Sequence, residues 1–80
     1  MVYNNTQSIM RLEIAPGCTV SLGEGELRLM ESLRSKGKLS MLALTPDEIR
    51  SINALVNKNA VKRRNINGSV EYEIRPGIDW

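Results

Sequence analysis

Few residues of this chain are suited to covalent or acid-base chemistry. The 80 residues include no histidine and a single cysteine, Cys18. Cys18 has no imidazole to act as its general base, and a zinc site needs three or four thiolate or imidazole ligands. Glu24 and Glu26 fall on opposite flanks of a predicted helix start, and Glu71 and Glu73 have basic partners. The sequence therefore predicts no enzyme, no metal site and no cofactor.

The residues that could bind an anionic partner lie in the second half of the chain. The net charge is +2, and all of it belongs to residues 38–80, since residues 1–37 sum to zero. Lys58, Lys62, Arg63 and Arg64 form a run of cations that no acidic residue interrupts. Such groups can contact nucleic-acid phosphates, each contact adding a salt-dependent contribution to affinity.

A helix immediately before this run has the clearest start signal in the sequence. Thr45 is a good N-cap, Pro46 suits the first helical position, and Glu48 completes a capping box. Asn59 tolerates the left-handed conformation that ends many helices. The pattern predicts a helix over residues 46–58. Its face opposite the core is expected to carry Asp47, Arg50, Ser51, Ala54, Asn57 and Lys58.

A β-hairpin is predicted directly after this helix. Asn67-Gly68 separates two alternating segments, and this pair is typical of a two-residue type I′ turn. The resulting register places Arg64 opposite Glu71 and Lys62 opposite Glu73, so these cations either pair across the strands or contact phosphates. The core side is expected to carry Val61, Val70, Tyr72 and Ile74.

Two further elements are predicted in the first half. Residues 9–14 and 18–22 alternate as an N-terminal hairpin, for which a loop over Pro16 to Cys18 would pair Ile14 with Val20 and Leu12 with Leu22. Apolar residues at helical spacing predict a helix over 24–36, ended by Gly37. Residues 38–44 are long enough for one or two helical turns, and a short strand is the alternative.

This order of elements resembles the winged helix-turn-helix class of DNA-binding domains. The resemblance rests on the segments 42–49 and 55–64 and on the hairpin ending at Ile74. Val20-Ser21-Leu22 and the helix after it also look like the entry to the first helix of response-regulator DNA-binding domains. The expected fold is α+β: an N-terminal β-hairpin, two main helices with a short linking helix or strand, and a C-terminal hairpin as the wing.

The resemblance implies a non-catalytic, DNA-binding transcriptional regulator. Helix 46–58 would enter the major groove and hairpin 61–75 would act as the wing, with Arg75 as a further backbone contact. The predicted DNA-contacting residues are Arg50, Ser51, Asn57, Lys58, Lys62, Arg64 and Asn67. The alternative is a protein-interaction module, an adaptor or inhibitor, that the acidic helix start at Asp47 and Glu48 would suit. A homodimer is compatible with either function.

The sequence predicts one domain in an intracellular protein. Residues 1–8 are expected to be a flexible N-terminus, 9–75 the domain and 76–80 a tail. The first ten residues lack the basic and apolar regions of a signal peptide. No apolar stretch reaches the roughly 18 residues that a membrane span requires. We therefore expect a cytoplasmic location and no membrane partner.

Overall fold

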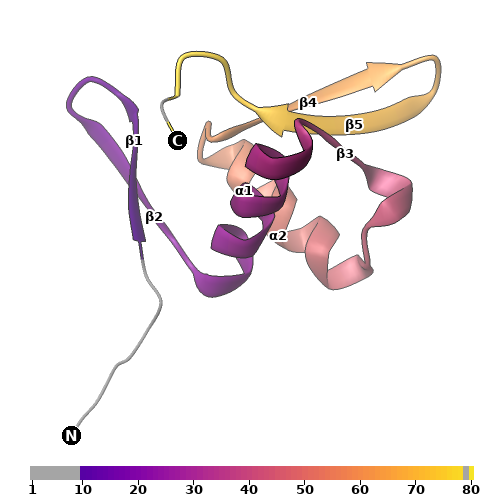
Figure 1. Ribbon diagram of the computed structural model, residues 1–80, viewed down its shortest axis with the longest axis horizontal. Helices are drawn as coiled ribbons and strands as arrows, with labels where there is room; N and C mark the ends of the chain where they lie inside the picture. Colours follow the sequence, from indigo (N-terminus) through magenta and orange to yellow (C-terminus); the bar gives the residue numbers. More distant parts are fainter. Residues whose placement is uncertain (1–9, 79) are drawn as a thin grey trace, which may run out of the picture.

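The computed structural model describes residues 10–78 and Trp80, and it is an α+β arrangement with two helices and two small antiparallel sheets (Figure 1). The predicted flexible segment 1–8 lies outside the described residues. The elements in chain order are β1 (Met10–Ala15), β2 (Cys18–Leu22), α1 (Glu24–Lys36), β3 (Leu39–Ser40), the 3₁₀ turn η1 (Met41–Ala43), α2 (Pro46–Asn57), β4 (Val61–Ile66) and β5 (Ser69–Ile74).

Helix α2 has the predicted cap at its start and the predicted break at its end. The Thr45 hydroxyl accepts a hydrogen bond from the Glu48 amide at 3.2 Å, and the Glu48 carboxylate accepts one from the Thr45 amide at 2.8 Å. At the other end Asn59 takes a φ of 65°, and the Ala60 amide donates to the Leu55 carbonyl. The chain thereby passes from α2 into β4 within three residues.

The segment 38–44 contains both of the structures that the sequence left open. Leu39 and Ser40 form β3, which pairs with β5 so that Leu39 lies opposite Tyr72. The Ser40 hydroxyl then accepts a hydrogen bond from the Leu42 amide and caps η1. The second sheet accordingly has the strand order β3-β5-β4.

The predicted register of the N-terminal hairpin is wrong. Leu12 pairs with Val20 and Met10 with Leu22, and the register shifts between Glu13 and Ala15. The shift is a β-bulge at Ile14, which adds one residue to β1 without an added partner on β2. A two-residue loop combined with this bulge keeps apolar residues opposite each other. Gly17 has the expected positive φ, at 76°.

The register of the β4–β5 hairpin is confirmed. Ile66 pairs with Ser69, Arg64 with Glu71 and Lys62 with Glu73. Tyr72 and Val61 belong to the opposite face of the sheet and are buried in the core. Figure 1 shows this hairpin as a long arm that extends beyond α1.

One hydrophobic core joins both helices to both sheets. It contains Leu12 and Leu22 from the first hairpin, Leu29, Met30 and Leu33 from α1, Leu39 from β3, Ile52 and Leu55 from α2, and Ala60, Val61 and Tyr72. Trp80 packs against this core, its indole N–H donating to the Met30 carbonyl at 3.2 Å. The Arg34 guanidinium lies 5.1 Å from the centre of its ring. Ile78 and Trp80, both in the segment predicted as a tail, thus pack against the core.

The α2 capping box gives a stability prediction that does not depend on function. Thr45→Ala removes the acceptor for the Glu48 amide and is expected to lower the free energy of unfolding by about 1 kcal/mol. Urea denaturation would measure the loss. Thr45→Ser, which keeps the hydroxyl, is the control, and equal stability of Thr45→Ala and wild type would contradict the assigned cap.

Candidate nucleic-acid interface

The exposed face of α2 carries two of the predicted DNA-contacting residues. Arg50 and Asn57 are both exposed. Arg50 forms an ion pair with Asp47 one turn earlier, and both side chains are more than three-quarters exposed. An ion pair this open to water contributes little to stability, so Arg50 can exchange its partner for another anion.

Ser51 does not share that exposed face. It is half-buried and lies against α1, where a Cβ atom at Gly25 would come within 3.3 Å of the Ser51 hydroxyl. The two helices approach closely here because position 25 has no side chain. The helical wheel placed Ser51 opposite the core, but the neighbouring helix covers that side of α2.

Lys58 has structural partners within the domain. Its ammonium group lies 2.8 Å from a carboxylate oxygen of Glu26 and 2.7 Å from the Ser21 carbonyl oxygen. The Glu26 side chain is only 13% exposed and also accepts a hydrogen bond from the Gly23 amide. Lys58 therefore ties the end of α2 to the junction between β2 and α1, a long-range contact that sequence spacing does not indicate.

Ion pairs on the outer face of the second sheet differ from the predicted ones. Arg64 pairs with Glu73 at 3.5 Å, diagonally across the hairpin, instead of with Glu71. Glu71 pairs with Lys38 at the β3 side, also at 3.5 Å. Long side chains reach diagonal neighbours as readily as direct ones, so the register alone did not fix the partners. Asn67 lies at the exposed hairpin tip, with a φ of 53°.

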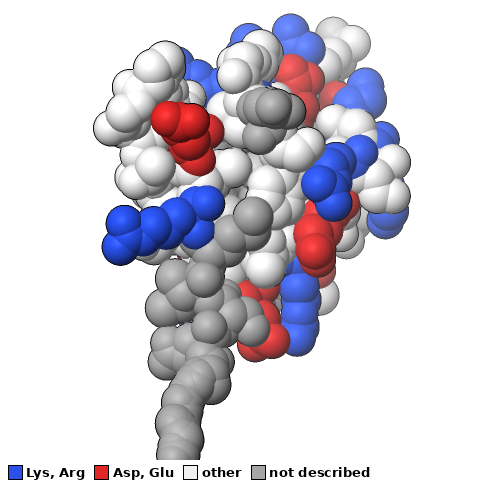
Figure 2. Space-filling view, turned by 60° about the vertical axis from the view of Figure 1, so that its left-hand side comes forward, with Lys and Arg blue, Asp and Glu red and all other residues white. Residues whose placement is uncertain are grey.

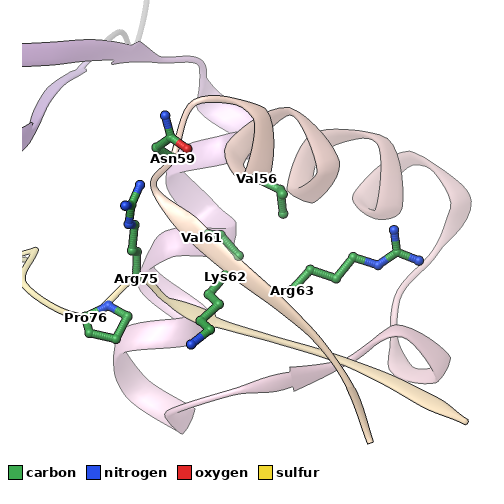
Figure 3. Close-up of a pocket in the computed structure, with 7 residues that line it drawn as sticks. All are labelled: Val56, Asn59, Val61, Lys62, Arg63, Arg75 and Pro76. Atoms are coloured by element: carbon green, nitrogen blue, oxygen red, sulfur yellow. The ribbon is translucent and has the colours of Figure 1, made fainter.

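Six exposed cations have no acidic partner among the residues that the structure describes, and three of these, Lys62, Arg63 and Arg75, lie together. They line a shallow hollow of about 560 Å³, which we call the basic hollow, where the end of α2 meets β4 and the end of β5. Val56, Asn59, Val61 and Pro76 complete its lining (Figure 3).

The three cations of the basic hollow diverge. In Figure 3 Arg63 extends to the right below α2, Lys62 points down and away from the helix, and Arg75 points up on the side of Asn59. A small anion binds best to donors that converge on one point. Cations that lie apart are better suited to contact successive phosphates along a nucleic-acid backbone. The geometry thus favours an extended anionic partner.

Asn53 is a candidate that the sequence analysis missed. It is half-buried on α2, one turn from both Arg50 and Asn57, and its side-chain oxygen accepts a hydrogen bond from the Tyr72 hydroxyl at 3.4 Å. This bond orients the amide group of Asn53. Residues 50, 53 and 57 are spaced so that they lie along one face of a helix. This spacing was the sequence signal that could have identified Asn53.

Charge elsewhere on the surface is mixed. Figure 2 shows Lys and Arg side chains interspersed with Asp and Glu on the side of the molecule that it turns forward. Among residues 10–78 and 80, no three acidic or thiol side chains come together in a group that could hold a metal ion. None of the described helices is long and apolar enough to cross a membrane.

Comparison of the chain with protein-family models, curated proteins and solved structures finds no match. Its function is therefore inferred from its own residues and their geometry.

The Lys58 contacts generate a second stability prediction. Lys58→Met leaves the mostly buried Glu26 carboxylate without its cation and is expected to lower the free energy of unfolding by about 1–3 kcal/mol. The double variant with Glu26→Gln should recover part of that loss, since the uncompensated charge is gone. Urea denaturation of both variants tests this, and equal losses in the single and double variants would show that the pair is not coupled.

Proposed function

We propose that this protein is a small DNA-binding protein of the winged helix-turn-helix kind, acting as a transcriptional regulator. Helix α2 enters the major groove through Arg50, Asn53 and Asn57, which can reach base edges or phosphates. The β4–β5 hairpin is the wing. Lys62, Arg63 and Arg75 contact the phosphate backbone beside the groove.

The observation that carries this proposal is the position of the basic hollow. It lies where α2 passes into β4, and its Arg63 is on the α2 side of the sheet, so a duplex lying along the exposed stripe of α2 would reach this cation first. The sheet order β3-β5-β4 gives further support, because β3 and η1 then stand where a winged helix has its first strand and middle helix. Under this proposal the single turn η1 takes the position of the middle helix.

Lys58, Ser51 and Arg64 have smaller roles than the sequence suggested. Lys58 is held by Glu26 and Ser21, and Ser51 lies against α1. Arg64 reaches DNA only if it leaves Glu73, and the exchange of one exposed ion pair for another costs little. Asn67 at the hairpin tip is placed to approach the adjacent minor groove or backbone.

One observation favours a second function, a protein-interaction module. Leu42 in η1 is 90% exposed, which is unusual for a large apolar side chain in a turn. An adaptor or inhibitor could insert this leucine into a pocket of another protein. DNA binding is the better supported function because three cations line the basic hollow, whereas the support for a protein partner is one strongly exposed leucine.

The two functions separate in an NMR titration with random-sequence duplex DNA at low and then moderate salt. DNA binding predicts amide shifts concentrated in residues 46–68 and around Arg75, and it predicts that salt reverses them. The absence of any response at low salt would overturn the proposed function.

Two matched variants test whether the wing touches the backbone. Glu73→Gln removes the acidic partner of Arg64, whereas Glu71→Gln removes that of Lys38, which lies beside the β3 edge of the sheet. Both variants remove one negative charge. Glu73→Gln is expected to bind non-specific DNA more tightly and to steepen the dependence of log affinity on log salt by about one unit, for one added phosphate contact. Equal affinities of the two variants would mean that Arg64 makes no such contact.

The basic hollow gives a further prediction. Lys62→Ala and Arg75→Ala are each expected to reduce the salt slope by about one unit and to weaken binding uniformly across sequences. Lys36→Ala, at the exposed end of α1, removes the same charge and serves as the control. Fluorescence anisotropy over a salt series measures the DNA affinity of all three variants. If Lys36→Ala loses as much affinity as the other two, the effect comes from net charge alone.

A further inference from the structure

The edges of the two sheets differ in what they offer to another strand. β4 forms an outer edge that carries Lys62, Arg63 and Arg64. Antiparallel pairing of this edge with a second copy, centred on Arg63, would put Lys62 opposite the partner copy's Arg64. Like charges directly opposite are destabilising, so β4 is protected against self-association.

The outer edge of β2 is partly occupied. The Ser21 carbonyl accepts a hydrogen bond from Lys58 at 2.7 Å, so it points away from β1 and toward the end of α2. This bond also shows which residues of the hairpin have main-chain groups that point outward. In an antiparallel pair the residues whose main-chain groups point inward alternate with those whose groups point outward.

Arg11 lies opposite Ser21 and Glu13 lies opposite Thr19, so both belong to the outward-pointing set of β1. Their main-chain N–H and C=O groups face the outer edge of the hairpin, and no described residue forms a backbone hydrogen bond with them there. Both side chains are exposed and share the solvent face of the strand. Figure 1 shows the β1–β2 hairpin at one side of the molecule, away from the three-stranded sheet.

The charges on this edge are complementary to themselves. If two β1 strands pair antiparallel about a two-fold axis at Leu12, Arg11 of each copy lies opposite Glu13 of the other. Arg11 and the partner copy's Glu13 would then exchange main-chain hydrogen bonds and also form an ion pair between their side chains. The two-fold axis repeats this pair, so the interface would contain it twice. An isolated two-stranded hairpin is marginally stable, and this pairing would extend it to a sheet of four strands.

We propose that this protein forms a homodimer through antiparallel pairing of β1 with β1 of a second copy. The ion pairs between Arg11 and Glu13 fix the register. The interface is separate from α2 and the basic hollow, so it stands whether or not the chain binds DNA.

A charge-swap experiment tests the dimer by light scattering or sedimentation equilibrium over a dilution series. Wild type is expected to reach twice the single-chain mass of 9.0 kDa at high concentration. Arg11→Glu and Glu13→Arg each make both cross-strand pairs repulsive and are expected to weaken association about tenfold or more. The double variant Arg11→Glu/Glu13→Arg restores opposite charges and should restore the dimer.

Mixing the two single variants is the decisive measurement. A chain with two acids at positions 11 and 13 complements a chain with two arginines there, so the mixture should form a heterodimer although each variant alone stays monomeric. Lys36→Glu, an equal charge change on α1, should dimerise as wild type does, and circular dichroism checks that every variant is folded. Monomeric wild type at all concentrations, or single variants that dimerise normally, would overturn the proposal.

Discussion

The burial of Tyr72 is the constraint on which most of the structure depends. Its side chain is completely buried, yet it lies on the central strand of a sheet with only three strands. Leu39 on β3 and Arg63 on β4 flank it, and its hydroxyl donates to Asn53 of α2. Burying an aromatic ring while satisfying its hydroxyl requires both neighbouring strands and the helix to be in place. One side chain thereby couples the hairpin to the helix that is proposed to read DNA.

The short connection from α2 to β4 fixes where the cations at the start of β4 lie relative to the helix. Asn59 in the left-handed conformation and the buried Ala60 bring Val61 into the core directly after the helix. The alternation of β4 then leaves Lys62 on the outer face of the sheet and Arg63 on the side of α2. Ion pairing decides which cations remain available, since Lys58 is used within the domain. The fold therefore selects which cations line the basic hollow: Lys62 and Arg63 of the sequence run do so, whereas Lys58 and Arg64 have acidic partners.

Local patterns predicted the elements well because each depends on neighbours in sequence. The capping box at Thr45 and the Asn67-Gly68 turn specify a helix start and a register without tertiary information. The bulge at Ile14 could not be predicted, since it satisfies the same apolar alternation as the loop that was expected. The contacts of the candidate site residues were predicted less well than the elements. Lys58 meets Glu26, and Ser51 meets α1, through contacts between elements distant in sequence, which helical periodicity does not contain.

The two-residue strand β3 has a consequence for how the chain reaches this structure. Every other strand pairs with the strand next to it in sequence, and both helices are bounded by local caps or turns. The pairing of β3 with β5, by contrast, joins residues on either side of η1, α2 and β4. Hairpins and helices form within microseconds, but a contact that closes so long a loop must first overcome its closure entropy. Closing β3 onto β5 is thus one of the non-local steps of folding, and we expect it to follow the formation of the hairpins and helices.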